Sequence, residues 1–152
     1  MRASVDRRAA LTLGIGGVAA ALWCGTSGSA FAKNNSDELI RKFTGGKEAA
    51  EGRVRLDLPE IAENGNTVPM SVFVESPMDE QSYVTDVLVV GDGNPNAGIA
   101  TFHFSTASGV AEANVRIRLA ETQNIIAIAK MNDGSLFMTT KPVKVTIGGC
   151  GG

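Results

Sequence analysis

Apolar and polar side chains alternate along most of the chain between residues 53 and 147. In residues 53–58, for example, apolar side chains alternate with charged ones, as expected for a strand that buries one face. Comparable apolar or β-branched runs occupy residues 70–74, 83–90, 100–105, 114–119, 124–130 and 143–147. Turn-forming residues separate these runs, notably in 64–66 and 91–98. The pattern predicts roughly seven or eight short strands in an antiparallel β-sandwich of the immunoglobulin-like type.

A short helical pattern precedes the strands. The apolar residues Leu39 and Phe43 would share one face of a helix over residues 36–44. Ser36 is placed to act as the N-cap of this helix, and Gly45 is placed to end it. The predicted fold class is therefore all-β, with one short N-terminal helix before the sandwich.

The first 32 residues have the composition of a secretory signal peptide. Arginines open the segment, an apolar stretch follows over residues 9–23, and the sequence Ala-Phe-Ala ending at Ala32 matches the pattern that a leader peptidase cleaves. The adjacent Arg7 and Arg8 indicate the twin-arginine route, which exports folded proteins. Because the apolar stretch is shorter than a membrane span of roughly 20 residues, we expect a periplasmic protein whose leader is removed near Ala32.

Removal of this leader changes both the charge and the cysteine content. It leaves 120 residues, and the formal net charge changes from −2 to −4 because the leader carries three arginines and one aspartate. A mildly acidic domain offers no basic patch for nucleic acid or anionic lipid. Cys24 leaves with the leader, so that Cys150 cannot form an internal disulfide. A lone cysteine in an exported chain indicates intermolecular pairing or a working thiol.

The C-terminal segment, residues 148–152, places this cysteine between two pairs of glycines. Since glycine lacks a Cβ, we expect a thin, flexible arm beyond a domain that spans residues 33–147. Extended, the arm would reach about 17 Å. Such an arm could carry the Cys150 thiol into a narrow channel, as a carrier must when several enzymes act on one sulfur atom. The glycines of the predicted arm are Gly148, Gly149, Gly151 and Gly152.

The sequence around Cys150 contains no residue that would activate its thiol. No His, Lys or Arg adjoins it, so nothing nearby in the sequence would lower the pKa of the thiol. The arrangement therefore suits a thiol that is activated inside a partner protein better than an autonomous nucleophile.

Other candidate chemistry is sparse. His103 is the single histidine of the chain and falls on the polar face of its predicted strand. One histidine and one cysteine cannot supply the three or four ligands of a zinc site, so we interpret His103 as a surface or partner-contact residue. The remaining carboxylates considered are interpreted as solvated loop charges: Glu60, Glu63, Asp79 and Glu80. No catalytic or metal-binding residue is predicted, and we expect a protein that is not an enzyme.

The terminal sequence Gly-Gly-Cys-Gly-Gly, after a β-rich exported domain, resembles the SoxY family of sulfur-carrier subunits from the Sox thiosulfate-oxidising system. The resemblance extends over nearly all of the mature chain. The segments that are similar to the family are residues 51–68, 99–108, 116–122 and 143–152.

This resemblance implies an immunoglobulin-like carrier that forms a heterodimer with a SoxZ-like subunit. A SoxAX-like c-type cytochrome complex would couple thiosulfate to Cys150 as an S-thiosulfonate, and a SoxB-like manganese-dependent hydrolase would release sulfate from it. In some organisms a SoxCD-like sulfane dehydrogenase, which contains molybdenum, would oxidise the remaining persulfide sulfur. The carrier itself would bind no cofactor and would hold only the covalent sulfur adduct.

Two other interpretations remain open at this point. An exported β-sandwich interaction module could dimerise through a Cys150 disulfide, in which case thiosulfate would leave the thiol unchanged. Alternatively, the final Gly-Gly resembles the end of ubiquitin-like sulfur carriers, which use a C-terminal thiocarboxylate. Those carriers are compact proteins without leaders, so the predicted signal peptide and strand pattern argue against the second interpretation.

Overall fold

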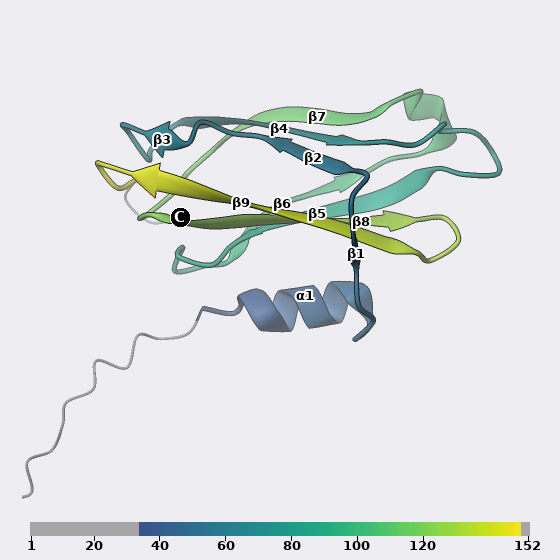
Figure 1. Ribbon diagram of the computed structural model, residues 1–152, viewed down its shortest axis with the longest axis horizontal. Coiled ribbons are helices and arrows are strands. Elements are labelled where there is room, and N and C mark those ends of the chain that lie inside the picture. Colours follow the sequence, from purple (N-terminus) through teal and green to yellow (C-terminus); the bar gives the residue numbers. More distant parts are fainter. Residues whose placement is uncertain (1–33, 150–152) are drawn as a thin grey trace, which may run out of the picture. The chain divides into compact units, whose positions relative to one another are not determined.

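Two β-sheets packed face to face form most of the computed structural model, which describes residues 34–149 (Figure 1). The six-stranded sheet has the order β1-β9-β8-β5-β6, with β3 paired to β9 outside this order, and the three-stranded sheet has the order β2-β4-β7. The strands are β1 (Ala50–Glu51), β2 (Val54–Asp57), β3 (Ile61–Ala62), β4 (Val68–Val74), β5 (Val84–Gly91), β6 (Gly98–His103), β7 (Ala111–Ile117), β8 (Gln123–Met131) and β9 (Leu136–Val145). The helical elements are α1 (Ser36–Thr44) and a 3-10 turn, η2 (Thr106–Ser108). The prediction of an all-β sandwich with one short helix is confirmed.

Strand pairing is antiparallel within the main body of both sheets, as predicted. Two short strands depart from this pattern, because β1 and β3 both run parallel to β9. Strand β9 also begins at Leu136, seven residues before the apolar run that indicated it. Strands of two residues are too short to carry an alternating pattern, so neither β1 nor β3 could be recognised from the sequence.

The main core lies between the two sheets and is built from the apolar residues that alternate along the strands. From opposite sheets, Val72 of β4 and Val87 of β5 are both fully buried. Burial of each such side chain stabilises the fold by about 1.5–3 kcal/mol. Other fully enclosed side chains of this core include Val84, Val89, Leu119, Ile125 and Val143.

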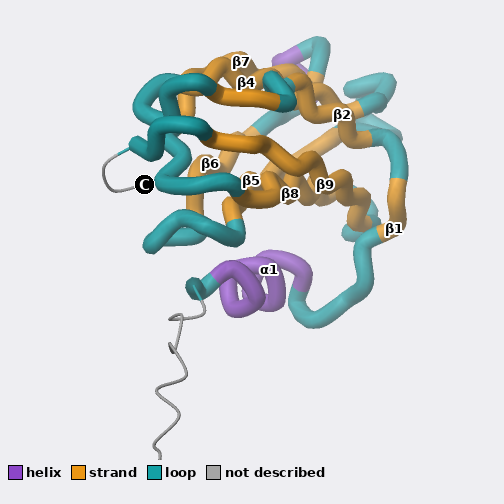
Figure 2. Tube along the Cα trace, turned by 60° about the vertical axis from the view of Figure 1, so that its left-hand side comes forward, coloured by secondary structure: helices purple, strands orange, loops and turns teal. Residues whose placement is uncertain are grey.

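Helix α1 covers the outer face of the six-stranded sheet, where it contacts β5 (Figure 1). Figure 2 shows the same arrangement from a second direction, with α1 lying against the sheet on the side opposite β2, β4 and β7. Strand β5 is consequently buried on both faces: Val87 and Val89 point into the sandwich, whereas Val90 is enclosed on the outer side. This second layer explains why β5 reads as a continuous apolar run and not as a strict alternation.

The ends of α1 agree with the prediction except at the N-cap. The N-cap is Asn35 and not Ser36, which is the first residue of the helix. The side chain of Asn35 makes no capping hydrogen bond, because its Oδ1 accepts the backbone N–H of Ala97 instead, at 3.1 Å. Gly45 ends the helix in the left-handed conformation, with φ of 65°. In the described residues no helix is long and apolar enough to cross a membrane.

Candidate functional site

Strand β9 leads directly into the predicted carrier arm. After β9 ends at Val145, Thr146 continues along the chain and its backbone N–H donates to the carbonyl of Ala62 at 3.0 Å. The Thr146 hydroxyl donates to the carbonyl of Glu63 at 2.9 Å. Gly148 and Gly149 follow and are the last residues that the structure describes. Cys150, Gly151 and Gly152 lie outside the described residues, so the prediction that Cys150 carries the substrate stays a prediction.

Backbone hydrogen bonds hold Gly149 against two loops of the domain. Its N–H donates to the carbonyl oxygen of Leu119 at 2.8 Å, and the Leu119 N–H donates to the carbonyl oxygen of Gly65 at 2.8 Å. The Gly65 N–H in turn donates to the carbonyl oxygen of Ile147 at 2.7 Å. Three segments that are distant in sequence therefore meet through their main chains. We call this arrangement of Gly65, Leu119, Ala120, Gly148 and Gly149 the arm seat.

Glycine is required in the arm seat because the three backbones approach one another closely. A Cβ on Gly148 would collide with the carbonyl oxygen of Ala120, and a Cβ on Gly65 would collide with that of Leu119. At Gly149 a Cβ would lie 2.7 Å from the carbonyl oxygen of Gly65, which is closer than real Cβ contacts allow. None of these three glycines has a positive φ. Close packing, and not a special backbone conformation, therefore explains the choice of residue.

The arm seat bears on the predicted flexibility of residues 148–152. In the structure Gly149 is buried and hydrogen-bonded, and Gly148 has no room for a side chain. The first pair of arm glycines is thus packed against the domain instead of extending freely from the end of β9. For Gly151 and Gly152, which lie outside the described residues, flexibility stays a prediction.

A buried asparagine supports the loop that receives the arm. Asn94 lies between β5 and β6 and is only 2% exposed. Its Nδ2 donates to the carbonyl of Arg118 at 3.0 Å, and its Oδ1 accepts the N–H of Ala120 at 2.9 Å. The same Oδ1 accepts a hydrogen bond of 2.8 Å from the side chain of Gln123. Asn94 therefore fixes the residues on both sides of Leu119.

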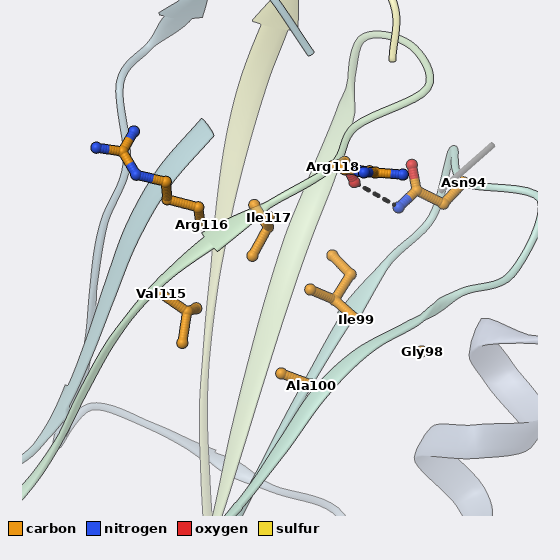
Figure 3. A pocket seen from close by; sticks show the side chains of 8 residues that line it. All are labelled: Asn94, Gly98, Ile99, Ala100, Val115, Arg116, Ile117 and Arg118. Carbon is orange, nitrogen blue, oxygen red and sulfur yellow. Dashed lines mark hydrogen bonds between the residues drawn. The ribbon is translucent and has the colours of Figure 1, made fainter. Parts of the chain in front are cut away.

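An apolar cleft of about 400 Å³ opens between the edges of β6 and β7, beside the arm seat. Figure 3 shows Ile99 of β6 facing Val115 and Ile117 of β7 across this cleft. The hydrogen bond between Asn94 and the Arg118 carbonyl closes one end of the cleft (Figure 3). The cleft thus ends at the residue that precedes Leu119, next to the point where the arm is held.

Comparison with protein families identifies the chain. The model of the family described as sulfur oxidation protein SoxY matches residues 40–150. The chain belongs to the SoxY family. Among solved structures it is similar to the sulfur carrier protein SoxY from Chlorobium limicola f thiosulfatophilum, with 28% identity, a TM-score of 0.62, and coverage of 73% of this chain and 96% of that chain. The family predicted from the terminal pentapeptide is therefore confirmed, and with it a role as a carrier in sulfur oxidation.

More distant structures share the SoxY sandwich. The superoxide reductase (neelaredoxin) from Ignicoccus hospitalis is 16% identical, with a TM-score of 0.55 and coverage of 62% of this chain and 80% of that chain. The superoxide reductase from Nanoarchaeum equitans is 14% identical, with a TM-score of 0.54 and coverage of 63% of this chain and 100% of that chain. At these identities the likeness shows the fold alone. No curated protein sequence matches the chain.

In this SoxY-family chain, His103 lies far from the arm seat along strand β6. It pairs with Asp86 of β5, with 2.6 Å between its Nδ1 and the carboxylate Oδ1, and its side chain is 75% exposed. Gly98, at the other end of β6, lines the cleft beside the arm seat. The interpretation of His103 as a surface residue is confirmed. Within residues 34–149 no group of three or more His, Cys, Asp and Glu side chains is placed to hold a metal ion.

Sequence reasoning missed two residues that shape the SoxY arm seat. Gly65 and Asn94 both belong to segments that were interpreted only as turns, 64–66 and 91–98. Turn composition describes the loop but not what packs against it. In the sequence, a glycine that is needed because another backbone packs against it cannot be told from an ordinary turn glycine. The same holds for a buried asparagine.

Proposed function

We propose that the mature chain is a periplasmic carrier that binds thiosulfate-derived sulfur covalently on the thiol of Cys150 and presents it to the other proteins of the Sox system. The observation that carries this proposal is the extent of the family match, which runs to residue 150 and so includes the lone cysteine of the mature chain. The solved structure that is similar to this chain is described as a sulfur carrier protein. The arm seat supports the proposal because it anchors the residue directly before that cysteine to the folded domain.

The proposed chemistry needs only an accessible sulfur atom from this chain. In loading, a sulfur–sulfur bond forms between the Cys150 thiol and the sulfane sulfur of thiosulfate, and the thiol proton is released. Two electrons pass to an acceptor, for which we propose a c-type cytochrome complex. Water then cleaves the bond between the sulfane sulfur and the sulfonate, which releases sulfate and leaves a persulfide on Cys150. In this scheme the chain is not an enzyme, because its partners supply the redox and hydrolytic groups.

The proposed partners follow from membership of the SoxY family. They are a SoxZ-like subunit in a heterodimer, a SoxAX-like cytochrome complex, a SoxB-like hydrolase and a SoxCD-like sulfane dehydrogenase. Export through the twin-arginine route would allow the SoxZ-like subunit, which lacks a leader, to cross the membrane together with the folded carrier. We propose leader removal near Ala32, two residues before the first described residue.

The intact mass of the protein tests this function directly. The protein is purified from its own periplasm without reductant and is measured before and after the addition of thiosulfate. We expect increments of about 32 Da for one sulfur or about 112 Da for a thiosulfate unit, lost on reduction and mapped to Cys150. An unmodified monomer, or a disulfide-linked dimer that thiosulfate does not change, would overturn the carrier proposal; the dimer would favour the interaction module.

A further inference from the structure

Asn94 is more deeply buried and makes more hydrogen bonds than is usual for an asparagine in a surface loop. Its side chain is 2% exposed, and both of its polar atoms bond to the main chain or to Gln123. Its own carbonyl accepts a hydrogen bond of 3.0 Å from the Nδ2 of Asn34, which also donates to the carbonyl of Gly91 at 2.8 Å. Asn94 is therefore held from both sides, and removal of its side chain would leave buried backbone groups without partners.

Gln123 reinforces the position of Asn94. Its Nε2 donates to the Oδ1 of Asn94 at 2.8 Å and to the carbonyl of Glu121 at 3.0 Å. Its Oε1 accepts the N–H of Gly93, the residue before Asn94, at 3.2 Å. Gln123 is itself only 5% exposed. The loop that follows β5 and the loop that follows β7 are thereby joined by a closed set of hydrogen bonds.

The backbone groups that Asn94 holds flank the residue that anchors the arm. Arg118 and Ala120 each bond to its side chain, while Leu119 between them accepts the N–H of Gly149 and donates to Gly65. The Leu119 side chain is fully buried, so this residue is fixed by its own packing as well as by its two neighbours. The acceptor for the arm is thus a preorganised carbonyl and not a mobile loop atom.

We propose that Asn94 is a positioning residue for the carrier arm, which it serves by holding Leu119 so that Gly149 stays in the arm seat. The inference rests on the proposed function, since it takes Cys150 to be the carrier thiol. With Gly149 anchored, the point at which Cys150 is attached to the domain is fixed at the residue directly before it. In this proposal the arm seat fixes the place on the domain at which partner enzymes find the residue that carries the sulfur adduct.

The proposal is tested by amide hydrogen exchange, measured by NMR on the full mature chain with Cys150 reduced. We use the ratio of the exchange rate of the Gly149 amide to that of the Val89 amide in the core. This ratio compares the opening of the arm seat with the opening of the whole fold. In Asn94→Ala we expect this ratio to rise by about tenfold, the effect of losing roughly one hydrogen bond. The matched control is Val84→Ala, which removes fully buried side-chain volume at the opposite end of β5 and is expected not to raise the ratio, because it destabilises the core amide at least as much as the arm.

A milder variant covers the case in which Asn94→Ala does not fold. Asn94→Ser places an uncharged hydroxyl, which can both donate and accept, in the same buried site, so we expect a rise of the ratio between those of the wild type and Asn94→Ala. An unprotected Gly149 amide in the wild type, or a ratio that neither Asn94 variant changes, would overturn the proposal. The measurement requires no sulfur adduct, so its outcome is distinguishable from a failure of Cys150 to be loaded.

Discussion

The N–H of Gly149 donates a hydrogen bond to the carbonyl of Leu119 at 2.8 Å, which anchors the chain one residue before Cys150. Cys150 is the residue directly after this anchor, and one residue extends at most about 3.6 Å. In an arm that is free from Gly148 onward, Cys150 is the third residue, and three residues extend at most about 10 Å. The anchored carrier consequently needs its partners to approach the end of the sandwich more closely than a free five-residue arm would.

Replacement of Cys150 by Ser is expected to abolish sulfur loading and to leave the fold intact. In the sequence Cys150 comes after β9 and after the last anchored residue, so we expect the core not to depend on its side chain. Intact mass after addition of thiosulfate measures loading, and thermal unfolding measures stability. A Tm several degrees below that of the wild type would contradict this expectation, because it would mean that the thiol packs against the domain.

Replacement of Gly148 by Ala is expected to destabilise the domain. The new Cβ would collide with the carbonyl oxygen of Ala120, and relief of the collision requires the arm or the loop to move. We expect the free energy of unfolding in urea to fall by about 1–3 kcal/mol, the usual cost of overpacking. The matched control is Gly151→Ala in the second glycine pair of the arm. Equal stability of the two variants would show that the arm seat is not occupied in solution.

Protonation of Asp133, in the turn between β8 and β9, should be unusually difficult. Hydrogen bonds from the Ser135 hydroxyl, at 2.5 Å, and from the Ser135 N–H, at 2.8 Å, hold the pKa of this carboxyl below its ordinary value of 3.8. A lowered pKa means that the charged form stabilises the fold above pH 3.8 and that this contribution is lost as the pH falls through the folded-state pKa.

The variant Ser135→Ala removes the hydroxyl, the larger cause, and keeps the N–H. NMR titration of the Asp133 carboxyl should therefore show its pKa rising toward the ordinary value without reaching it. A titration curve identical to that of the wild type would show that the hydroxyl does not bind the carboxylate in solution.

Lys130 and Phe43 should be energetically coupled across the contact between α1 and β8. The Nζ of Lys130 lies 4.5 Å from the centre of the Phe43 ring, within range of a cation–π interaction. A double-mutant cycle of Lys130→Gln and Phe43→Leu is expected to give a coupling of about 0.5–1 kcal/mol in urea unfolding. Lys144→Gln on β9 serves as the control for loss of charge. A coupling near zero would show that the ammonium prefers solvent to the ring.

Strands with one apolar and one polar face could be predicted from the sequence. Strands that are defined only by their pairing with a neighbouring strand were missed. Strand β2 alternates cleanly because its apolar side chains face the core and its charged ones face solvent. The first half of β9 was missed because Thr139, Thr140 and Lys141 are all polar and Pro142 normally ends a strand. In the fold, β1 and β3 pair with β9 on either side of this stretch, at Phe137–Met138 and Lys144–Val145. Only the tertiary arrangement shows that β9 is continuous.

The arm itself was predictable from composition, but its attachment was not. A cysteine between glycine pairs identifies a thin segment, and glycine without context indicates freedom of rotation. The Ala120 carbonyl that leaves no room for a Cβ on Gly148 belongs to a loop that lies 28 residues earlier in the chain. Such a contact leaves no periodicity or spacing in the sequence from which it could be inferred.

The two ends of the described chain bond to neighbouring loops, which the Asn94 side chain joins: Asn34 donates to the carbonyl of Asn94, and Gly149 donates to that of Leu119. A bulky group attached near either Asn34 or Gly149 would therefore crowd the end of the domain that holds the arm seat. The turn at residues 132–135 joins β8 to β9 at the ends of these two strands that are remote from the arm seat. For immobilisation on a sensor surface or attachment of a fluorophore, this turn is the suitable place, because it leaves the working end open to other proteins.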